Sequence, residues 1–263
     1  METFTYKNVY LNEVSTIAGP YEKKGPLGSY FDKTYDEFYF HKKTWEQAES
    51  KLIEESIDLV LRKLNKTRFD IDVHIGGDLL NQIVASNYAA SRLKIPFLGI
   101  YSACATSMEG MIIGANLVEA KLVKNCLVTT SSHNNAAEKQ FRYPVEYGAV
   151  KKKTTTFTVT GGTCAYLSRE KSMIKIDSAT IGTVEDMGEK DVMNMGAVMT
   201  PAAASTIYKH LKNTKRNISY YDLILTGDLG MYGEKMLKEF MEVEYRLKLK
   251  NYKDAGTMIY DLD

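Results

Sequence analysis

Cys104 lies in the segment whose residue types are best suited to binding or reacting with a ligand. The apolar run that begins at Ile95 ends in YSACATSMEG, residues 101–110, a pattern that predicts a buried strand, a tight turn and the start of a helix. Free amide groups and the helix dipole at such a turn favour the thiolate form of a cysteine. The segment therefore predicts a reactive or anion-binding cysteine, with a small buried core residue as the alternative.

His133 and Asn134 follow a second apolar segment, residues 126–130, which is typical of a buried strand. Ligands of open α/β sheets lie outside the carboxyl ends of the strands, so both side chains are candidate ligand contacts. The alternative is that the two residues only form hydrogen bonds that close the end of the strand.

Arg142 stands between Phe141 and Tyr143, which places a forked hydrogen-bond donor beside aromatic surface. Such an arrangement suits a planar dicarboxylate. It equally suits an ion pair with the nearby Glu146, and the residues alone leave both interpretations open.

Asp78 belongs to a segment that occurs twice. Residues 71–79 (IDVHIGGDL) align with residues 221–229 (YDLILTGDL), and a predicted helix precedes each copy. Asp78 and its counterpart Asp228 are candidates for ligand contact or for capping the helix that follows. The repeat predicts a duplicated α/β unit.

The composition is that of an ordinary globular protein. The chain has 263 residues, 44% of them hydrophobic, and its 34 basic and 33 acidic residues give a formal net charge of +1. This balance does not concentrate nucleic acid, so no nucleic-acid binding is expected. The three cysteines are widely spaced, and neither a disulfide framework, a metal site nor another cofactor is expected. Any contact with a membrane is expected to be peripheral, because the chain shows neither a signal sequence nor a long apolar stretch.

Alternating helices and strands must position these side chains. Thr44 and Gln47 form a capping box at the start of a helix that reaches Leu64, with Glu49 expected on its polar face. The pattern then predicts a strand at 71–75, a helix at 79–93, a strand at 95–100 and a helix that ends near residue 121. This order is typical of a parallel sheet.

Less regular segments flank this core. The first forty residues are rich in Gly, Pro, Tyr and Asp and predict an ordered loop. Strands are expected at 155–160, 164–168 and 174–183, with a hairpin-like turn at Gly161 and Gly162. A later helix is expected at 202–211, with His210 on its surface.

Several of these motifs together resemble one family, the stage V sporulation protein AD family of spore-forming bacteria, whose members are thiolase-like. The resemblance runs nearly from end to end of the chain. It is carried by residues 25–28, 31–36, 77–84, 95–99, 103–109, 131–134, 140–144, 146–148, 201–204 and 221–229.

The resemblance implies an α/β fold of the thiolase type, a duplication with layers in the order α-β-α-β-α. The two thiolase-like halves would be residues 1–170 and 171–263. Family members continue for several tens of residues past the match to Asp263, so the second half is expected to be shortened at its C-terminus. Thiolase-like proteins commonly pair about a twofold axis, which implies a homodimer.

The same resemblance implies a binding role. These proteins are understood to bind dipicolinic acid, pyridine-2,6-dicarboxylate, alone or with calcium, for its uptake into the developing spore. Their partners are membrane proteins of the same sporulation operon, which implies a peripheral position on the cytoplasmic side of the spore inner membrane. The ligand-binding candidates are Cys104, His133, Asn134, Arg142 and Asp78, and no catalytic residue is expected.

Two alternatives stay open. Thiolase-like enzymes use a cysteine in the place of Cys104 as an acyl-accepting nucleophile, so one alternative is an acyltransferase or condensing enzyme. Such enzymes draw two further groups, usually His with His or Asn, from the second half, where His210 is the only histidine of this sequence. The other alternative is a scaffold that docks membrane partners.

Overall fold

The computed structural model describes residues 2–260, which divide into two compact units. The larger unit comprises residues 6–148 and 158–177. The described residues of the smaller unit are 2–5, 149–157 and 178–260. The sequence predicts two halves of a duplicated fold that meet at residue 170. These halves are not the same division as the two compact units, and their boundary stays a prediction.

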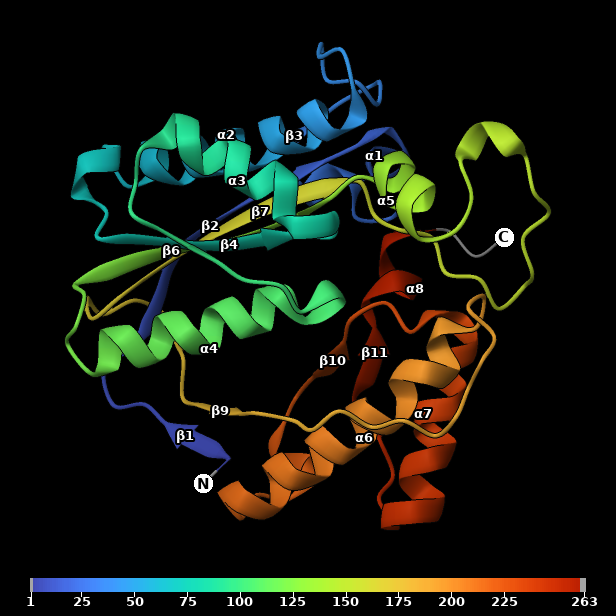
Figure 1. Cartoon of the computed structure of the whole chain (residues 1–263). Helices are drawn as coiled ribbons and strands as arrows, with labels where there is room; N and C mark the ends of the chain where they lie inside the picture. Colours follow the sequence, from blue (N-terminus) through green and yellow to red (C-terminus); the bar gives the residue numbers. More distant parts are fainter. Residues whose placement is uncertain (1, 261–263) are drawn as a thin grey trace. The chain divides into compact units, whose positions relative to one another are not determined.

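A seven-stranded sheet forms the middle of the larger unit (Figure 1). Its order is β3-β2-β7-β6-β4-β5, and β8 pairs with β2. β4, β5 and β6 run parallel, as the βαβ order predicts, whereas β7 runs antiparallel to both β6 and β2. The strands are β2 (Tyr10–Ala18), β3 (Lys33–Thr34), β4 (Val73–Asp78), β5 (Phe97–Gly99), β6 (Asn125–Ser132), β7 (Gly161–Ser168) and β8 (Ile174–Lys175).

Helices cover both faces of this sheet. α2 (Trp45–Lys63) and α3 (Val84–Leu93) pack on one face, and α4 (Thr106–Glu119) packs on the other (Figure 1). The N-cap at Thr44 is confirmed, because its hydroxyl accepts a hydrogen bond from the Gln47 amide at 3.2 Å. The Gln47 side chain accepts from the Lys43 amide at 3.3 Å instead of from the Thr44 amide, which corrects the reciprocal half of the predicted capping box. Two short helices, α1 (Pro20–Lys24) and α5 (Asn134–Phe141), complete the larger unit.

The core of the larger unit lies between α2 and the sheet. Ile53 and Ile57 of α2 are fully buried and belong to one cluster with Leu127 of β6 and Tyr166 of β7. Burying one such aliphatic side chain contributes about 1.5–3 kcal/mol. The apolar spacing of the helix therefore fixes which of its faces rests on β6 and β7.

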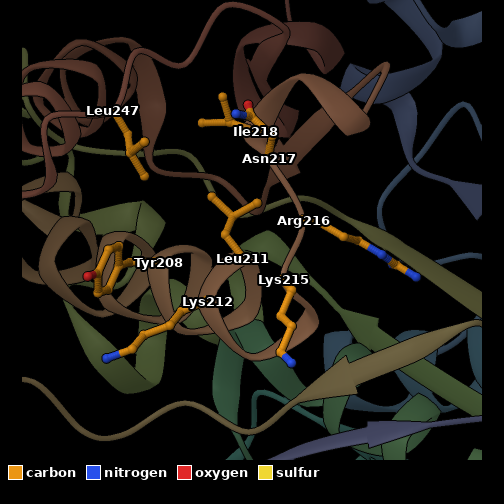
Figure 2. A pocket seen from close by; sticks show the side chains of 8 residues that line it. All are labelled: Tyr208, Leu211, Lys212, Lys215, Arg216, Asn217, Ile218 and Leu247. Carbon is orange, nitrogen blue, oxygen red and sulfur yellow. The ribbon is translucent and has the colours of Figure 1, made fainter.

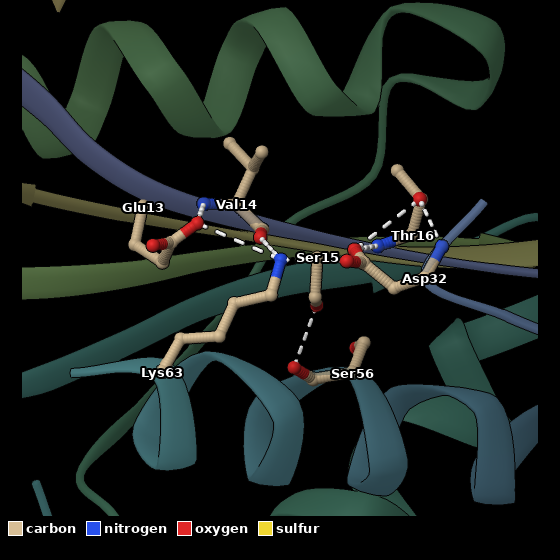
Figure 3. Close-up of polar contacts among 7 residues, drawn as sticks. All are labelled: Glu13, Val14, Ser15, Thr16, Asp32, Ser56 and Lys63. Carbon is tan, nitrogen blue, oxygen red and sulfur yellow. Dashed lines mark hydrogen bonds and ion pairs between the residues drawn. The ribbon is translucent and has the colours of Figure 1, made fainter. Parts of the chain in front are cut away.

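β2 corrects the expectation of a loop through the first forty residues. This strand pairs with β3 and β7 inside the sheet. Residues distant in the sequence hold it (Figure 3): the Thr16 amide donates to Asp32 at 2.8 Å, and Ser15 donates to the Ser56 carbonyl at 2.7 Å. The ammonium nitrogen of Lys63, at the end of α2, lies 2.7 Å from Oδ1 of Asp32, the carboxylate oxygen that Thr16 does not contact. The strand thus depends on partners that local propensity does not reveal.

We expect Asp32→Asn to lower the free energy of unfolding by about 1 kcal/mol at neutral pH, since it removes a half-buried charge pair. Burial alone would raise the pKa of Asp32, but hydrogen bonds from Lys63 and Thr16 hold it below its usual value. The carboxylate therefore adds stability above pH 3.8, and that stability is lost as the pH falls through the lowered pKa. Urea unfolding measures this difference. Asp36→Asn, which breaks an exposed pair with Lys23, is the control and should change little.

Gly161 and Gly162 also differ from expectation. They begin β7 and pair with β2 and β6 instead of forming a hairpin turn, and residues 155–160 form no strand. A Cβ on Gly162 would lie 2.8 Å from the Cβ of Leu52, so glycine lets α2 approach the sheet closely here. The strand expected at 174–183 divides into β8 and β9 (Ser178–Thr180).

The smaller unit contains two small sheets and a helix pair. β1 (Thr3–Thr5) pairs antiparallel with β9, and β10 (Ile224–Thr226) pairs parallel with β11 (Tyr252–Asp254). α6 packs against α7 around a core that includes Leu237 and Met241. The helices are α6 (Met195–Thr214), α7 (Gly230–Tyr245) and α8 (Ala255–Ile259).

The sequence repeat corresponds to the same succession of elements in both units. A 3-10 turn at Arg68–Asp70 joins α2 to β4, and one at Ile218–Tyr220 joins α6 to β10. Within residues 2–260, the helices are all too short or too polar to span a lipid bilayer.

Candidate functional site

Cys104 lies in a 3-10 turn, Ala103–Ala105, between β5 and α4, which confirms the predicted strand, turn and helix. Its side chain is exposed, whereas Cys126 and Cys164 are buried. Burial raises the pKa of the Cys126 thiol to about 12 and also raises the pKa of Cys164. Cys104 is therefore the thiol that a ligand or reagent reaches.

Thr106 closes the turn that carries Cys104. Its hydroxyl donates to the Ala103 carbonyl at 2.8 Å and accepts from the Ser102 amide at 3.0 Å. Ala103 has φ of 46°, a left-handed conformation that is strained for a residue with a Cβ and often marks functional turns. Ala105 occupies the N-cap position of α4 and offers no side-chain oxygen to the first amide groups of that helix.

The parallel strands bring three of the candidate residues to one edge of the sheet. Asp78 ends β4, His133 follows β6, and Cys104 follows β5 after a short link. The register places Asp78 opposite Ser131 of β6. This edge is where open α/β sheets bind their ligands.

Asp78 caps the segment that follows its strand. Its two carboxylate oxygens accept the amides of Leu80 at 2.9 Å and of Ser86, in the first turn of α3, at 2.7 Å. The side chain is almost fully buried. Burial raises the pKa of Asp78, and the two amide hydrogen bonds oppose that rise. These contacts correspond to the capping interpretation.

His133 is fully buried among aromatic rings. Its Nε2 lies 2.7 Å from the Phe38 carbonyl, which only accepts, so Nε2 carries a proton. The rings of Phe38, Phe40 and Trp45 lie within 5.8–6.3 Å of the imidazole ring, centroid to centroid. Burial lowers the pKa of His133, so the imidazole is neutral at physiological pH.

Asn134 and Arg142 converge on residues 158–160. The backbone amide of Asn134 donates to the Thr160 hydroxyl at 2.9 Å, and the side-chain nitrogen of Asn134 donates to the Thr158 carbonyl at 3.0 Å. Arg142 donates to the Thr158 hydroxyl at 3.2 Å and to Glu138 at 2.5 Å. The ion-pair partner of Arg142 is therefore Glu138, one helical turn earlier, and not Glu146. Phe141 and Tyr143 beside it are about half exposed, which confirms the aromatic surface.

Glu49 lies on the buried side of α2 and not on the polar face where it is predicted. It is fully buried, and one carboxyl oxygen accepts from the Ser131 hydroxyl at 3.0 Å. The other oxygen has no hydrogen-bond partner among residues 2–260. Glu49 follows Trp45 by one helical turn and precedes Leu52 and Ile53 by another, so its spacing places it on the apolar face of α2.

Burial, followed by the charge of Asp78, raises the pKa of Glu49 well above its usual value. Two backbone amides stabilise the Asp78 carboxylate, whereas a single hydroxyl contacts Glu49. Glu49 therefore holds a proton more firmly than Asp78 does.

His210 is half-buried rather than a surface residue. Its Nδ1 lies 2.8 Å from the Thr180 hydroxyl, and its Nε2 lies 2.7 Å from the Tyr221 hydroxyl. Both ring nitrogens thus serve contacts inside the smaller unit. Across residues 2–260, His, Cys, Asp and Glu side chains nowhere gather in a group of three that could hold a metal ion.

Comparisons with known sequences point to one family. The family model described as stage V sporulation protein AD (SpoVAD) matches residues 2–263. The stage V sporulation protein AD of Bacillus subtilis is 46% identical to this chain over 263 residues, which are 100% of this chain and 78% of the relative.

Solved structures resemble the chain in fold. An OleA variant from Xanthomonas campestris has a TM-score of 0.64 at 10% identity, covering 96% of this chain and 86% of that one. The 3-oxoacyl-(acyl-carrier-protein) synthase III from Aquifex aeolicus has a TM-score of 0.58 at 11% identity, covering 98% and 85%. These neighbours are thiolase-like, and the likeness shows that this chain has the same kind of α/β fold.

Proposed function

Because the chain belongs to the stage V sporulation protein AD family, we propose that it binds dipicolinic acid, pyridine-2,6-dicarboxylate, during spore formation. The observation that carries this proposal is the family match over residues 2–263. In this proposal the chain acts as a peripheral homodimer on the cytoplasmic side of the spore inner membrane. It cooperates there with membrane proteins of the same operon as the ligand enters the spore.

The chemistry of the ligand favours the turn at Cys104 as its contact. A dicarboxylate needs hydrogen-bond donors for its oxygens and an apolar or aromatic wall for its ring. The first amide groups of α4 are such donors, and the dipole of this 14-residue helix adds attraction for an anion. Tyr101 and Met108, on either side of the turn, are half exposed or more and supply apolar surface.

The other candidates act by holding this edge of the sheet in place. Asp78, His133 and Asn134 are at most 3% exposed and already form hydrogen bonds within the larger unit. Arg142 is partly accessible, with 11% of its side chain exposed, and is neutralised by Glu138. We assign direct ligand contact to the Cys104 turn and a positioning role to the buried residues.

We further propose that the chain does not catalyse a reaction on its ligand. The ring nitrogen of the neutral His133 that could take a proton is Nδ1, and His133 is fully buried, so a reactant does not reach it. The competing function is acyl transfer, which the exposed Cys104 beside the strained Ala103 favours. Intact-mass measurement after incubation with acyl thioesters separates the two. We expect no adduct, and an acyl group on Cys104 that is absent from Cys104→Ser would establish the competing function.

The binding site is tested by calorimetric titration with pyridine-2,6-dicarboxylate, with benzoate as the comparison ligand. We expect saturable binding of the dicarboxylate in preference to benzoate. Cys104→Asp should weaken it at least tenfold, about 1.4 kcal/mol, because it places a negative charge among the donors. Cys104→Ser is the matched control and should bind almost normally, since backbone amides are the proposed donors. Equal affinities of the wild type and Cys104→Asp would show that the ligand binds elsewhere, and the absence of heat from folded wild type would refute the proposed function.

A further inference from the structure

Four connecting segments of the larger unit meet at the end of the sheet opposite to the Cys104 turn. Residues 66–72 lead into β4, residues 94–96 into β5 and residues 119–124 into β6, whereas residues 169–175 follow β7. Because β4, β5 and β6 run parallel and β7 runs antiparallel to β6, all four segments lie at one edge of the sheet, on the left of Figure 1. We call the surface formed by these four segments the basic edge.

Hydrogen bonds join the segments of the basic edge. The side-chain nitrogen of Asn125 donates to the Asp70 carbonyl at 2.9 Å, which connects the segment before β4 to the one before β6. The guanidinium of Arg169 donates to the Glu119 carbonyl at 3.3 Å, which connects the segment after β7 to the end of α4. These contacts fix the segments relative to one another.

Three apolar side chains project from the basic edge into water. Phe69 is 93% exposed, Leu122 is 73% exposed and Met173 is fully exposed. They are the three most exposed of the large apolar side chains in the larger unit that carry no hydroxyl group. Single exposed apolar residues are common on protein surfaces. Here all three lie at one end of the same sheet, which scattered exposure does not explain.

Positive charge surrounds these side chains. The four segments contain eight basic and four acidic residues, whereas the whole chain has a net charge of +1. Three of the four acidic residues already accept hydrogen bonds from backbone amides. Five lysines of the basic edge are exposed and form no ion pair among residues 2–260, namely Lys94, Lys121, Lys124, Lys171 and Lys175. Their ammonium groups are available to an anionic partner.

The association of charge with apolar surface distinguishes the basic edge from the cavity of about 250 Å³ in the smaller unit, which residues 208–218 and Leu247 line. Lys212 and Lys215 at that cavity are directed away from each other and from Leu211 (Figure 2). At the basic edge, charged and apolar side chains come from the same short segments: Lys121 precedes Leu122, and Lys171 lies two residues before Met173.

A cationic surface with projecting apolar side chains matches a membrane that contains anionic lipids. The headgroups attract the lysines, and the acyl region accepts the apolar side chains. An acidic protein surface would pair with the lysines equally well, but it offers no apolar layer to three separate projecting side chains.

We propose that the basic edge binds the surface of an anionic phospholipid membrane, with Phe69, Leu122 and Met173 inserted among the headgroups. The inference rests on the peripheral position in the proposed function and names the surface that provides it. The Cys104 turn, at the other end of the sheet, then faces away from the membrane and stays open to its ligand.

Sedimentation of the full chain with vesicles tests the role of the lysines. Vesicles of phosphatidylglycerol and phosphatidylcholine in equal parts are compared with vesicles of phosphatidylcholine alone. We expect at least tenfold stronger binding to the anionic vesicles, weakened by high salt. Lys121→Gln/Lys171→Gln should bind them at least tenfold more weakly, because it removes two charges from the basic edge. The matched control Lys235→Gln/Lys250→Gln, which removes two exposed charges from the smaller unit, should bind as the wild type does.

A second pair of variants tests the apolar side chains. Phe69→Ser/Leu122→Ser should weaken binding to the anionic vesicles at least tenfold, because less apolar surface leaves water. The control Tyr30→Ser/Val184→Ser removes two side chains that are exposed outside the basic edge, and it should bind normally. In Phe69→Trp, the added tryptophan emission should shift to shorter wavelength on these vesicles as the ring leaves water.

Several results would overturn this proposal. Absence of the wild type from the anionic pellet, equal binding to both kinds of vesicle, or normal binding of Lys121→Gln/Lys171→Gln would show that the lysines do not hold the chain on a membrane. Normal binding of Phe69→Ser/Leu122→Ser would show that the apolar side chains stay in water. Binding to polyglutamate as strong as to the vesicles would assign the basic edge to an acidic protein.

Calorimetric titration keeps this proposal separate from the proposed function. Lys121→Gln/Lys171→Gln should bind pyridine-2,6-dicarboxylate as the wild type does, because its substitutions lie at the end of the sheet opposite to Cys104. A failure of vesicle binding with intact dicarboxylate binding would therefore refute the membrane surface alone.

Discussion

Gly77→Ala is expected to lower the free energy of unfolding by about 3 kcal/mol. Gly77 lies in β4, next to Asp78. A Cβ at this position would lie 2.1 Å from the carbonyl oxygen of Ile100 and 2.9 Å from the methyl group of Thr106. The carbonyl belongs to the backbone and cannot rotate away, so the link between β5 and α4 must shift. Because Thr106 closes the Cys104 turn, the same shift should weaken the binding of pyridine-2,6-dicarboxylate.

Urea unfolding of the wild type and the variant measures this loss of stability. Gly227→Ala is the matched control, since a Cβ on Gly227 meets no atom within 4 Å. We expect the control to unfold within about 1 kcal/mol of the wild type. A midpoint for Gly77→Ala equal to that of the control would mean that β4 and the turn do not pack as described.

Glu49→Gln is expected to stabilise the chain at neutral and alkaline pH. Burial raises the pKa of Glu49 in the folded state, so the folded chain holds a proton that the unfolded chain releases above pH 4.5. Stability therefore falls by about 1.4 kcal/mol per pH unit from that value up to the raised pKa. Glutamine has nearly the shape of the protonated acid, keeps an acceptor for Ser131 and does not titrate, so the variant lacks this loss.

The measurement is urea unfolding of both proteins across the range above pH 6.5. Below pH 6.5 the titration of His74 also changes the stability, because burial lowers the pKa of His74 from 6.5 to about 4. That depressed pKa makes stability fall as the pH drops through this interval, the opposite trend to that of Glu49. Glu239→Gln, which removes an exposed carboxylate from α7, serves as the control and should leave the pH dependence unchanged. A Glu49→Gln variant less stable than wild type throughout would show that Glu49 is ionised and stabilising.

Local patterns were sufficient to predict α2, β4, β6 and the Cys104 turn. Apolar spacing and the Thr44 cap are properties of neighbouring residues, so they can be read without tertiary contacts. β2 was not predicted, because Asp32 and Lys63 hold it from other parts of the chain. The sequence predicts a turn at Gly162, since nothing next to it in the sequence shows that Leu52 packs against it.

The location of the candidate site could be predicted from the sequence, but the role of each of its residues could not. Strand order is enough to bring Asp78, Cys104 and His133 to one edge of the sheet. Burial is not a local property: His133 is enclosed by rings from residues 38–45, far away in the sequence. Glu49 is predicted on the polar face of α2 and is buried, although its helical spacing from Trp45 is that of the apolar face.

Hydrogen exchange with and without saturating pyridine-2,6-dicarboxylate tests most directly whether the ligand binds at the Cys104 turn. We expect slower exchange in residues 102–109, where the first amides of α4 lie, and no chemical change in the ligand. Unchanged exchange in this segment at a concentration that saturates the calorimetric signal would contradict it, as would slower exchange confined to residues 208–218.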